Sequence, residues 1–373
     1  MPTYTAPDYV LKRPRTRIVC TLGPATATAE RIEELIHAGM SVARLNLSHG
    51  KPIEHTESIA LVRAAADKTG VAVAVLADLP GPKHRLGPAP EPDDDDPGIV
   101  LTVGQKFTLK DGGDDSTSDV AYVHPPGFVS STPTGASVLI ADGVIQLKVV
   151  EARRDELECE VTVGGKILSD KAVSAPGHAS RISYLTVETA RALEEAATEH
   201  VDYVGISYIR SAADVRLVRD FFAARDFHPQ LIAKIELAEA MEDLNAIIDA
   251  SDGVMVARGD LGVELPVALV PGSQKKIIRR ANHVGKVVIT ATQMMESMIK
   301  SPVPTRAEVT DIANAILDGT DAIMLSGETS MGEFPIEATS TMAEVALEAE
   351  KLLDREEIAN RRRKGAQGLD SAI

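Results

Sequence analysis

Short apolar runs rich in β-branched residues recur along this chain and alternate with longer amphipathic stretches. Stretches such as TAERIEELIHAG and TRAEVTDIANAILDG have the periodicity of helices. Strands that alternate with helices pair in parallel, and these runs are too apolar to face water on either side. The pattern predicts an α/β fold, a (β/α)8 TIM barrel. Its eight strands are expected at residues 17–22, 41–47, 71–79, 203–208, 231–236, 253–258, 286–292 and 321–326.

The alternation stops between about residues 85 and 184. Here Pro and Gly are frequent, and short alternating runs such as IVLTVGQKFTLK are separated by turns such as DGG and VGG. This pattern is typical of antiparallel strands. We therefore expect a small β-barrel-like lid domain, inserted after the third barrel strand. The lid is placed at 87–181, and the TIM barrel at 1–86 and 182–360.

Two charged segments are interpreted as lying outside packed structure. The acidic run at 93–96 predicts a solvated loop, because four consecutive acids repel one another and cannot all face one metal ion. The charged tail at 361–373 is predicted to be disordered.

Composition excludes several classes of protein. The net charge of −16 argues against a nucleic-acid partner, although an anionic substrate can still bind in a local basic pocket. Cys20 and Cys159 lie far apart and suggest neither a disulfide nor a zinc site, which fits a reducing compartment. No signal-peptide core or membrane-spanning apolar run is found. We therefore expect a soluble cytoplasmic protein with no membrane partner.

Polar residues gather where the predicted strands end. The active site of such a barrel forms at the carboxyl ends of its strands, and barrel interiors are otherwise mostly Val, Ile and Leu. Charges concentrated at this one end therefore favour a functional site. The candidates are Arg44, Asn46, Ser48, His49, Asp78, Lys83, Arg85, Ser207, Arg210, Lys234, Glu236, Arg258, Asp260, Glu264, Thr292, Gln293, Ser326 and Glu328.

A metal site is predicted from two of the acids. Lys234 and Glu236 are two residues apart, so on a strand they point to the same face. Asp260 follows the neighbouring strand, which lets its carboxylate converge with that of Glu236. Two hard oxygen ligands with room for water suit Mg²⁺ or Mn²⁺. The alternative is a structural Lys–Glu pair within a barrel layer.

A polyanionic substrate is predicted from the neighbouring residues. Glycines flank Asp260 in ARGDLGVELP, where a loop enters a helical turn, and backbone N–H groups at a helix start can bind an anion. Arg44, Lys83, Arg85 and Lys234 supply the positive charge that a phosphorylated substrate requires. The site is interpreted as one for metal-assisted phosphoryl or enolate chemistry.

Long segments of the predicted barrel resemble the pyruvate kinase family. They are RTRIVCTLGPATATAERIEELIHAGMSVARLNLSHG, IAKIELAEAMEDLNAIIDASDGVMVARGDLGVELP and ITATQMMESMIKSPVPTRAEVTDIANAILDGTDAIMLSGETSMGEFPIEA. The inserted region fits the mobile lid of that family in position and size, although its sequence match is loose. The resemblance implies transfer of the phosphoryl group of phosphoenolpyruvate to ADP, which gives pyruvate and ATP.

The resemblance also implies roles for matching residues. Glu236 and Asp260 would hold the Mg²⁺ or Mn²⁺ ion, and Arg44 and Lys234 would neutralise the phosphoryl group in flight. Thr292 would protonate the enolate through water. The substrate would be bound by Gly259, Asp260, Thr292, Arg44 and Ser207, and the nucleotide by Asn46, His49, Lys171 and Arg85.

Three departures from the family pattern matter. The family commonly continues into a further domain that carries effector sites and part of the tetramer contact, whereas this sequence ends at Ile373. We therefore expect no allosteric control through that domain and a homodimer formed through the barrel. The lid segment SDKAVSAPG departs from KKGVNLPG, although Lys171 is kept, and SRISYLTVET replaces DLPALTEKD. These lid changes motivate an alternative, an enzyme that uses phosphoenolpyruvate or another enol phosphate with a different acceptor.

The third departure concerns a monovalent cation. The usual LDTKGPEIRTG is here LADLPGPKHRLG, which puts Lys83 in place of a glutamate that helps to bind K⁺. The other residues of that site match Asn46, Ser48 and Asp78, and some members of the family with Lys at this position are K⁺-independent. A lysine can put a fixed charge where a cation would sit, so catalysis is predicted to need Lys83 and no K⁺. The alternatives are a surface pair of Lys83 with Asp78, and a non-catalytic binding protein on the same scaffold.

Overall fold

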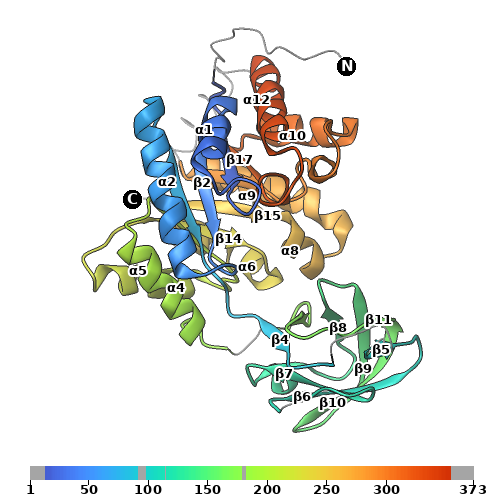
Figure 1. Cartoon of the computed structure of the whole chain (residues 1–373). Coiled ribbons are helices and arrows are strands. Elements are labelled where there is room, and N and C mark those ends of the chain that lie inside the picture. The colour runs from blue at the N-terminus through green and yellow to red at the C-terminus, as the bar shows by residue number, and fades with distance from the viewer. Residues whose placement is uncertain (1–12, 91–97, 114, 179–181, 354–373) are drawn as a thin grey trace, which may run out of the picture.

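The computed structural model describes residues 13–90, 98–113, 115–178 and 182–353. These residues form two closed barrels, one of mixed α and β structure and a smaller one of β strands (Figure 1). The acidic run at 93–96 and the tail at 361–373 lie outside the described residues, so their interpretation stays a prediction.

The larger barrel has eight described strands, which all pair in parallel and follow the predicted TIM-barrel order. The predicted fold class is therefore confirmed. Most of the strands end one or two residues before the predicted boundary, and the polar candidates follow at the rim. The strands are β1 (Arg17–Thr21), β2 (Met40–Asn46), β3 (Ala74–Asp78), β13 (Tyr203–Ile206), β14 (Gln230–Ile235), β15 (Gly253–Ala257), β16 (Val287–Ala291) and β17 (Ala322–Leu325).

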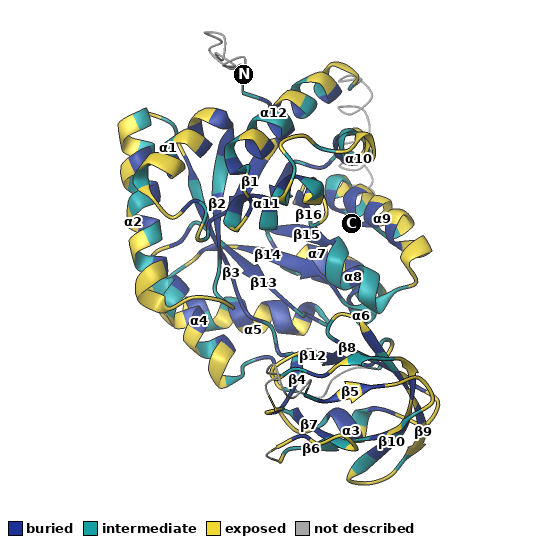
Figure 2. Cartoon of the chain, turned by 45° about the vertical axis from the view of Figure 1, so that its right-hand side comes forward, coloured by how far each residue is buried: buried dark blue, intermediate teal, exposed yellow. Residues whose placement is uncertain are grey.

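Helices cover the outside of this barrel, with buried faces turned toward the strands and exposed faces turned outward (Figure 2). The buried faces carry apolar residues that join the core. Sequence signals set several ends: Thr28 caps the first helix, and Thr305 with Glu308 forms a capping box. The helices are α1 (Ala29–Ala38), α2 (Pro52–Thr69), α4 (Val187–Thr198), α5 (Ala212–Ala223), α6 (Ala238–Glu242), α7 (Leu244–Ala250), α8 (Arg258–Glu264), η1 (Val267–Leu269), α9 (Val270–His283), η2 (Glu296–Ile299), α10 (Arg306–Asp318), α11 (Gly327–Ser330) and α12 (Pro335–Lys351).

Apolar side chains fill the interior of the larger barrel. Residues of different strands, such as Val19, Leu76 and Met255, form one buried cluster inside it, while a larger cluster joins the strands to the helices. The interior is therefore a packed core, and charged groups are left for its ends. Cys20 and Cys159 are both free and buried.

The smaller barrel has its own core and is closed by strands from the region where the alternation stops. Short strands β5 (Val100–Leu101) and β11 (Gly165–Lys166) pair with each other beside it. A short helix, α3 (Phe128–Ser131), packs against β6. The barrel strands are β4 (His84–Leu86), β6 (Lys106–Asp111), β7 (Val120–His124), β8 (Ser137–Ile140), β9 (Ile145–Ala152), β10 (Glu156–Val163) and β12 (Ala172–Ser174).

The expectation of antiparallel pairing is wrong for one pair of strands. β6 and β7 run parallel, with Thr108 opposite Val120, whereas the other described pairs of this barrel are antiparallel. The DGG segment at 111–113 does not close a hairpin. Instead β7 begins opposite Thr108, near the start of β6, so that both strands have the same direction.

The smaller barrel is inserted between β3 and α4 of the larger one. Its first and last strands, β4 and β12, are hydrogen-bonded neighbours. β4 already belongs to the smaller barrel, so the change of barrel comes between Asp78 and His84, slightly before the predicted boundary at residue 87. No helix among the described residues is long and apolar enough to cross a membrane.

Candidate active site

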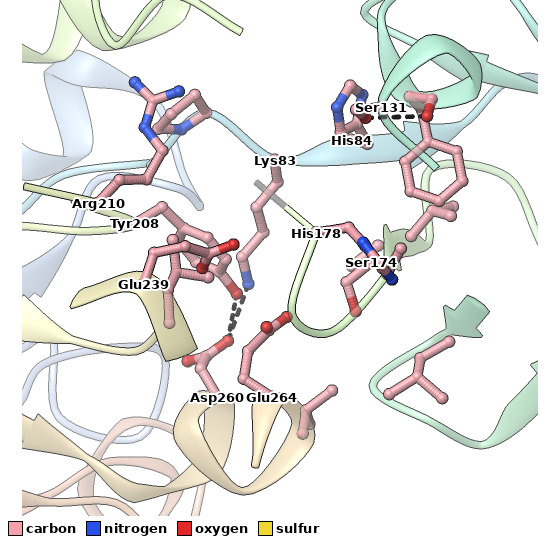
Figure 3. Close-up of a pocket in the computed structure, with 18 of the residues that line it drawn as sticks. Lys83, His84, Ser131, Ser174, His178, Tyr208, Arg210, Glu239, Asp260 and Glu264 are labelled. Atoms are coloured by element: carbon pink, nitrogen blue, oxygen red, sulfur yellow. Dashed lines mark hydrogen bonds and ion pairs between the residues drawn. The ribbon is translucent and has the colours of Figure 1, made fainter. Parts of the chain in front are cut away.

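A cleft lies between the carboxyl rim of the larger barrel and the smaller barrel (Figure 3). The rim contributes residues that follow β13, β14 and β15, and the smaller barrel contributes residues around β4 and β12. The insertion therefore covers the end of the barrel where the polar candidates gather. Polar residues that line the cleft include Lys83, Ser131, Ser174, His178, Tyr208, Arg210, Glu239, Asp260 and Glu264.

A buried network of charges lies at the rim, built from the ends of neighbouring strands. Asp78 closes β3 and is 1% exposed. Arg44 of β2 donates through Nε to Asp78 Oδ2 at 2.8 Å and through Nη1 to Thr21 Oγ1 at 2.9 Å. Lys234 of β14 lies with its Nζ 3.0 Å from Asp78 Oδ1 and donates to Ser207 Oγ at 2.7 Å. One carboxylate thus holds both cations in place.

The charges in this network determine one another's protonation. Burial alone would raise the pKa of Asp78, but Lys234 and Arg44 outweigh burial and hold this pKa below its ordinary value. Burial would lower the pKa of Lys234, yet Asp78 and Glu236 raise it above its ordinary value. Both groups are therefore charged at neutral pH, and the site presents a lysine and an arginine close together.

Glu236 follows β14 directly and is fully buried. Its Oε2 accepts the backbone N–H of Tyr208 at 2.6 Å. Its Oε1 lies 2.9 Å from Lys234 Nζ but makes no hydrogen bond to a described residue. Burial raises the pKa of Glu236 above its ordinary value, although Lys234 opposes the rise. Among the described residues, the buried Oε1 has the Lys234 ammonium as its one partner.

Asp260 approaches Glu236 from the neighbouring strand. β15 ends at Ala257, and α8 begins at once, which places Asp260 in its first turn. Lys83 Nζ lies 3.1 Å from Asp260 Oδ1, and the Tyr208 hydroxyl donates to the same oxygen (Figure 3). Burial would raise the pKa of Asp260, but Lys83 and Lys234 lower it below its ordinary value. Asp260 is therefore ionised.

These two acids fit a hard divalent cation. Oε1 of Glu236, whose one described partner is Lys234, and the ionised Asp260 are oxygen ligands of the kind that Mg²⁺ and Mn²⁺ prefer. Among the described residues, no group of three His, Cys, Asp or Glu side chains could enclose a metal ion. A cation held by two carboxylates keeps coordination positions for water and substrate, which is typical of Mg²⁺.

Thr292 lies beside the start of α8. Its hydroxyl accepts the backbone N–H of Gly259 at 2.8 Å and donates to the carbonyl of Ala291 at 2.6 Å. The Arg258 guanidinium donates to the Thr292 carbonyl at 2.6 Å and to Asp311 Oδ2 at 2.6 Å. Arg258 therefore supports the strand end, whereas the Thr292 hydroxyl and Gly259 meet at the rim.

Several other candidates have structural partners. Glu328 is buried and accepts the backbone N–H groups of Met295 and Ser326, which anchors two loops. Arg210 pairs with Asp214 on α5 while it also lines the cleft. Gln293 is exposed.

The predicted nucleotide-binding residues lie at the margin of this centre. Asn46 Oδ1 accepts the backbone N–H of Ser48, and both Ser48 and His49 are exposed before α2. On the smaller barrel, Arg85 donates to the carbonyl of Asp170, and Lys171 is exposed. The structure brings none of these side chains into the buried charge network, and their role stays a prediction.

Lys83 contacts residues other than those the sequence suggests. Its described contacts are Asp260 and the ring of Tyr208, whose centroid lies 4.2 Å from Nζ. The bonds to Asp78 come from Arg44, Lys234 and Ser207, and Asp78 is buried. The surface pair of Lys83 with Asp78 is therefore not formed.

Tyr208 is the functional candidate that sequence reasoning missed. It contacts both predicted metal ligands and Lys83. The available signal is its position after β13 and Ser207, at the same rim as the other candidates. A tyrosine at the end of an apolar strand nevertheless has the appearance of a core residue.

Glu264, at the end of α8, faces the cleft beside Glu239 of α6 (Figure 3). The backbone of Gly177, in the chain returning from the smaller barrel, opposes a rise in the pKa of Glu264. Burial, together with Glu239 and Asp260, raises the pKa of Glu264 to about 7. This acid therefore lines the cleft between the two barrels and titrates near neutrality.

Glu264→Gln is expected to remove a pH dependence of stability. The folded chain keeps this proton up to about pH 7, whereas an unfolded chain releases it near pH 4.3, so stability falls as pH rises between these values. At pH 8 the wild type must ionise this acid in the folded state, and the variant avoids that cost. Its free energy of unfolding should therefore exceed that of the wild type by about 1–2 kcal/mol, a modest gain because solvent screens a half-buried group. Urea unfolding at pH 5 and pH 8 measures this gain. Glu333→Gln at an exposed ion pair is the control, and equal gains at both pH values would contradict the prediction.

Comparisons with known proteins agree with this geometry. Residues 13–339 match the family described as pyruvate kinase, barrel domain. The chain is 41% identical over 95% of its length to a pyruvate kinase of Geobacillus stearothermophilus, and 43% identical over 89% to pyruvate kinase 2 of a Synechocystis strain. It spans 60% and 56% of these relatives. A crystal structure of a pyruvate kinase from Cryptosporidium parvum superposes with a TM-score of 0.89 at 35% identity, and the match covers 94% of this chain and 72% of that one.

Proposed function

Because this chain belongs to the pyruvate kinase family, we propose that it moves the phosphoryl group of phosphoenolpyruvate to ADP, giving pyruvate and ATP. The observation that carries this proposal is the pair of cations, Arg44 and Lys234, held by Asp78 beside the acids Glu236 and Asp260. Phosphoryl transfer depends mainly on positioning and on neutralising charge, and this arrangement can do both.

The side chains have distinct proposed tasks. Arg44 and Lys234 neutralise the phosphoryl oxygens, and both are already fixed in position, so little reorganisation is needed. Ser207 holds Lys234 in place and lies within reach of the substrate. The substrate carboxylate lies against the backbone of Gly259 and Asp260 at the start of α8, next to Thr292. The Thr292 hydroxyl then passes a proton, through water, to the enolate carbon.

Glu236 and Asp260 are proposed to hold Mg²⁺ or Mn²⁺. When bound, the cation supplies positive charge to the oxygens of the phosphoryl and enol groups. The acids provide the anchoring charge, and Lys234 keeps Glu236 oriented toward the same point. The nucleotide is proposed to approach from the side of Asn46 and His49, with Lys171 and Arg85 reaching it from the smaller barrel.

A direct assay tests this proposal. Purified protein is mixed with phosphoenolpyruvate, Mg²⁺ and ADP, and pyruvate is followed over time. Turnover at ordinary kinase rates, about 1–100 per second, is expected. Binding of phosphoenolpyruvate without turnover of ADP would instead favour the alternative, an enzyme with another phosphoryl acceptor. A chain that binds neither compound would contradict both.

Activity is further proposed to be independent of K⁺, because Lys83 brings a fixed positive charge to the rim. Tetramethylammonium chloride in place of KCl at equal ionic strength should leave kcat unchanged. Lys83→Glu should lower kcat in the absence of K⁺ and respond to added K⁺, whereas the exposed Lys106→Glu should do neither. A large loss in the wild type on removing K⁺ would contradict the idea.

The remaining proposals concern the state of the protein in the cell. We propose a cytoplasmic homodimer formed through the larger barrel. Sedimentation of the purified chain would show this dimer, and a monomer at micromolar concentration would contradict it.

A further inference from the structure

Tyr208 adopts an unusual backbone conformation at the end of β13. Its φ of 56° lies in the left-handed region, which residues other than Gly, Asn and Asp seldom adopt. Gly81 lies against it so closely that a Cβ on Gly81 would come within 2.6 Å of Tyr208 Cβ. The fold therefore holds this residue in a costly conformation, and costly conformations concentrate at functional sites.

The same residue bonds both carboxylates of the proposed metal site. Its backbone N–H donates to Glu236 Oε2 at 2.6 Å, and its hydroxyl donates to Asp260 Oδ1. Its ring lies under the Lys83 ammonium, which itself donates to Asp260 Oδ1 at 3.1 Å. Main chain, ring and hydroxyl of one residue thus act on three charged side chains.

These bonds select which oxygen of each acid Tyr208 leaves unbound. Tyr208 takes Oε2 of Glu236, and Oε1 faces Lys234 Nζ at 2.9 Å with no further partner among the described residues. Tyr208 and Lys83 take Oδ1 of Asp260, and among the described residues no hydrogen bond to Oδ2 is formed. Tyr208 therefore fixes each carboxylate through one oxygen and does not bond the other, which is Oε1 of Glu236 and Oδ2 of Asp260.

We propose that Tyr208 is a positioning residue of the divalent cation site, which orients Glu236 and Asp260 so that the oxygen of each acid that Tyr208 does not bond faces the ion. This inference rests on the proposed function, since it requires that these two acids hold the cation. Groups that orient metal ligands contribute strongly to affinity, and their loss typically weakens binding 10- to 100-fold. Tyr208 needs no direct contact with the ion for this effect.

The test is binding of Mn²⁺ alone, followed by the electron paramagnetic resonance signal of free Mn²⁺ without substrates. Tyr208→Phe removes the hydroxyl but keeps the ring under Lys83 and the backbone N–H to Glu236. We expect Mn²⁺ affinity to fall about 10- to 100-fold. Turnover lost at low Mg²⁺ should return at high Mg²⁺, which a general weakening of the fold would not produce.

Tyr184→Phe is the matched control. The Tyr184 hydroxyl is also buried nearby, but it donates to the carbonyl of Ser207 and touches neither acid. Mn²⁺ affinity should therefore be unchanged in this variant. A second variant, Asp260→Asn, distinguishes the role of Tyr208 from the existence of the metal site. If Asp260→Asn weakens binding and Tyr208→Phe does not, the role of Tyr208 is overturned. If Asp260→Asn has no effect, the metal site itself is overturned, and the role of Tyr208 with it.

Discussion

Lys234→Met should lower kcat about 10³- to 10⁵-fold, the range by which a single well-placed cation accelerates phosphoryl transfer. Lys234 is 9% exposed and lies within 3.0 Å of both Asp78 and Glu236, so it is the cation that joins these two acids. The variant should still fold, because Arg44 remains to balance Asp78 and Glu236 can take up a proton. Pyruvate formation measures the loss, and urea unfolding measures the fold.

The matched control for this change is Lys286→Met. Lys286 is half-buried and donates to the carbonyl of Ser251 at 2.7 Å, but it lies at the opposite end of the barrel, just before β16. The Lys286→Met variant should lose some stability and keep the kcat of the wild type. A kcat of Lys234→Met within about tenfold of the wild type would remove Lys234 from the proposed mechanism.

Asp78→Asn should lower the free energy of unfolding by about 3–5 kcal/mol, the usual effect of removing one partner from a buried ion pair. The change leaves Arg44 and Lys234 close together without the carboxylate that both contact. The pKa of Asp78 lies below its ordinary value, so its stabilising effect is complete above about pH 4 and lost as pH falls further. The free energy of unfolding of the variant should therefore fall less than that of the wild type as the pH is lowered below about 4.

Urea unfolding at pH 7 and pH 3.5 measures both effects. Asp252→Asn is the control, because Asp252 pairs with Arg219 and accepts the backbone N–H of Leu231 but is partly exposed at the other end of the barrel. Its loss should be about 1–2 kcal/mol. Equal losses in the two variants would contradict the view that the buried network depends on Asp78.

The larger barrel could be predicted from sequence because each of its strands is an apolar run followed by a helical pattern, and both signals are local. The β6–β7 pair could not be predicted in the same way. Alternation identifies a strand, but its direction depends on the path of the segment between Asp111 and Val120, which follows from contacts with the rest of the small barrel.

The charged residues of the site could be predicted as a group, because strand ends of a barrel meet at one rim. Their partners could not. The sequence places Lys83 near Asp78, but Asp78 is already bound by Arg44 and Lys234, so Lys83 lies on Asp260 instead. Glu328 also had the pattern of a site residue, yet it holds backbone N–H groups. Only the three-dimensional arrangement distinguishes these cases.

The pairing of β4 with β12 has a consequence for how the chain can change in length. Because the first and last strands of the insertion are neighbours, the larger barrel meets the insertion as a loop whose ends are already close together. Loop-closure entropy grows only slowly with length, by roughly 0.6 kcal/mol for each doubling. Residues can therefore be added to or removed from turns far from His84 and Ser174 with little effect on the larger barrel.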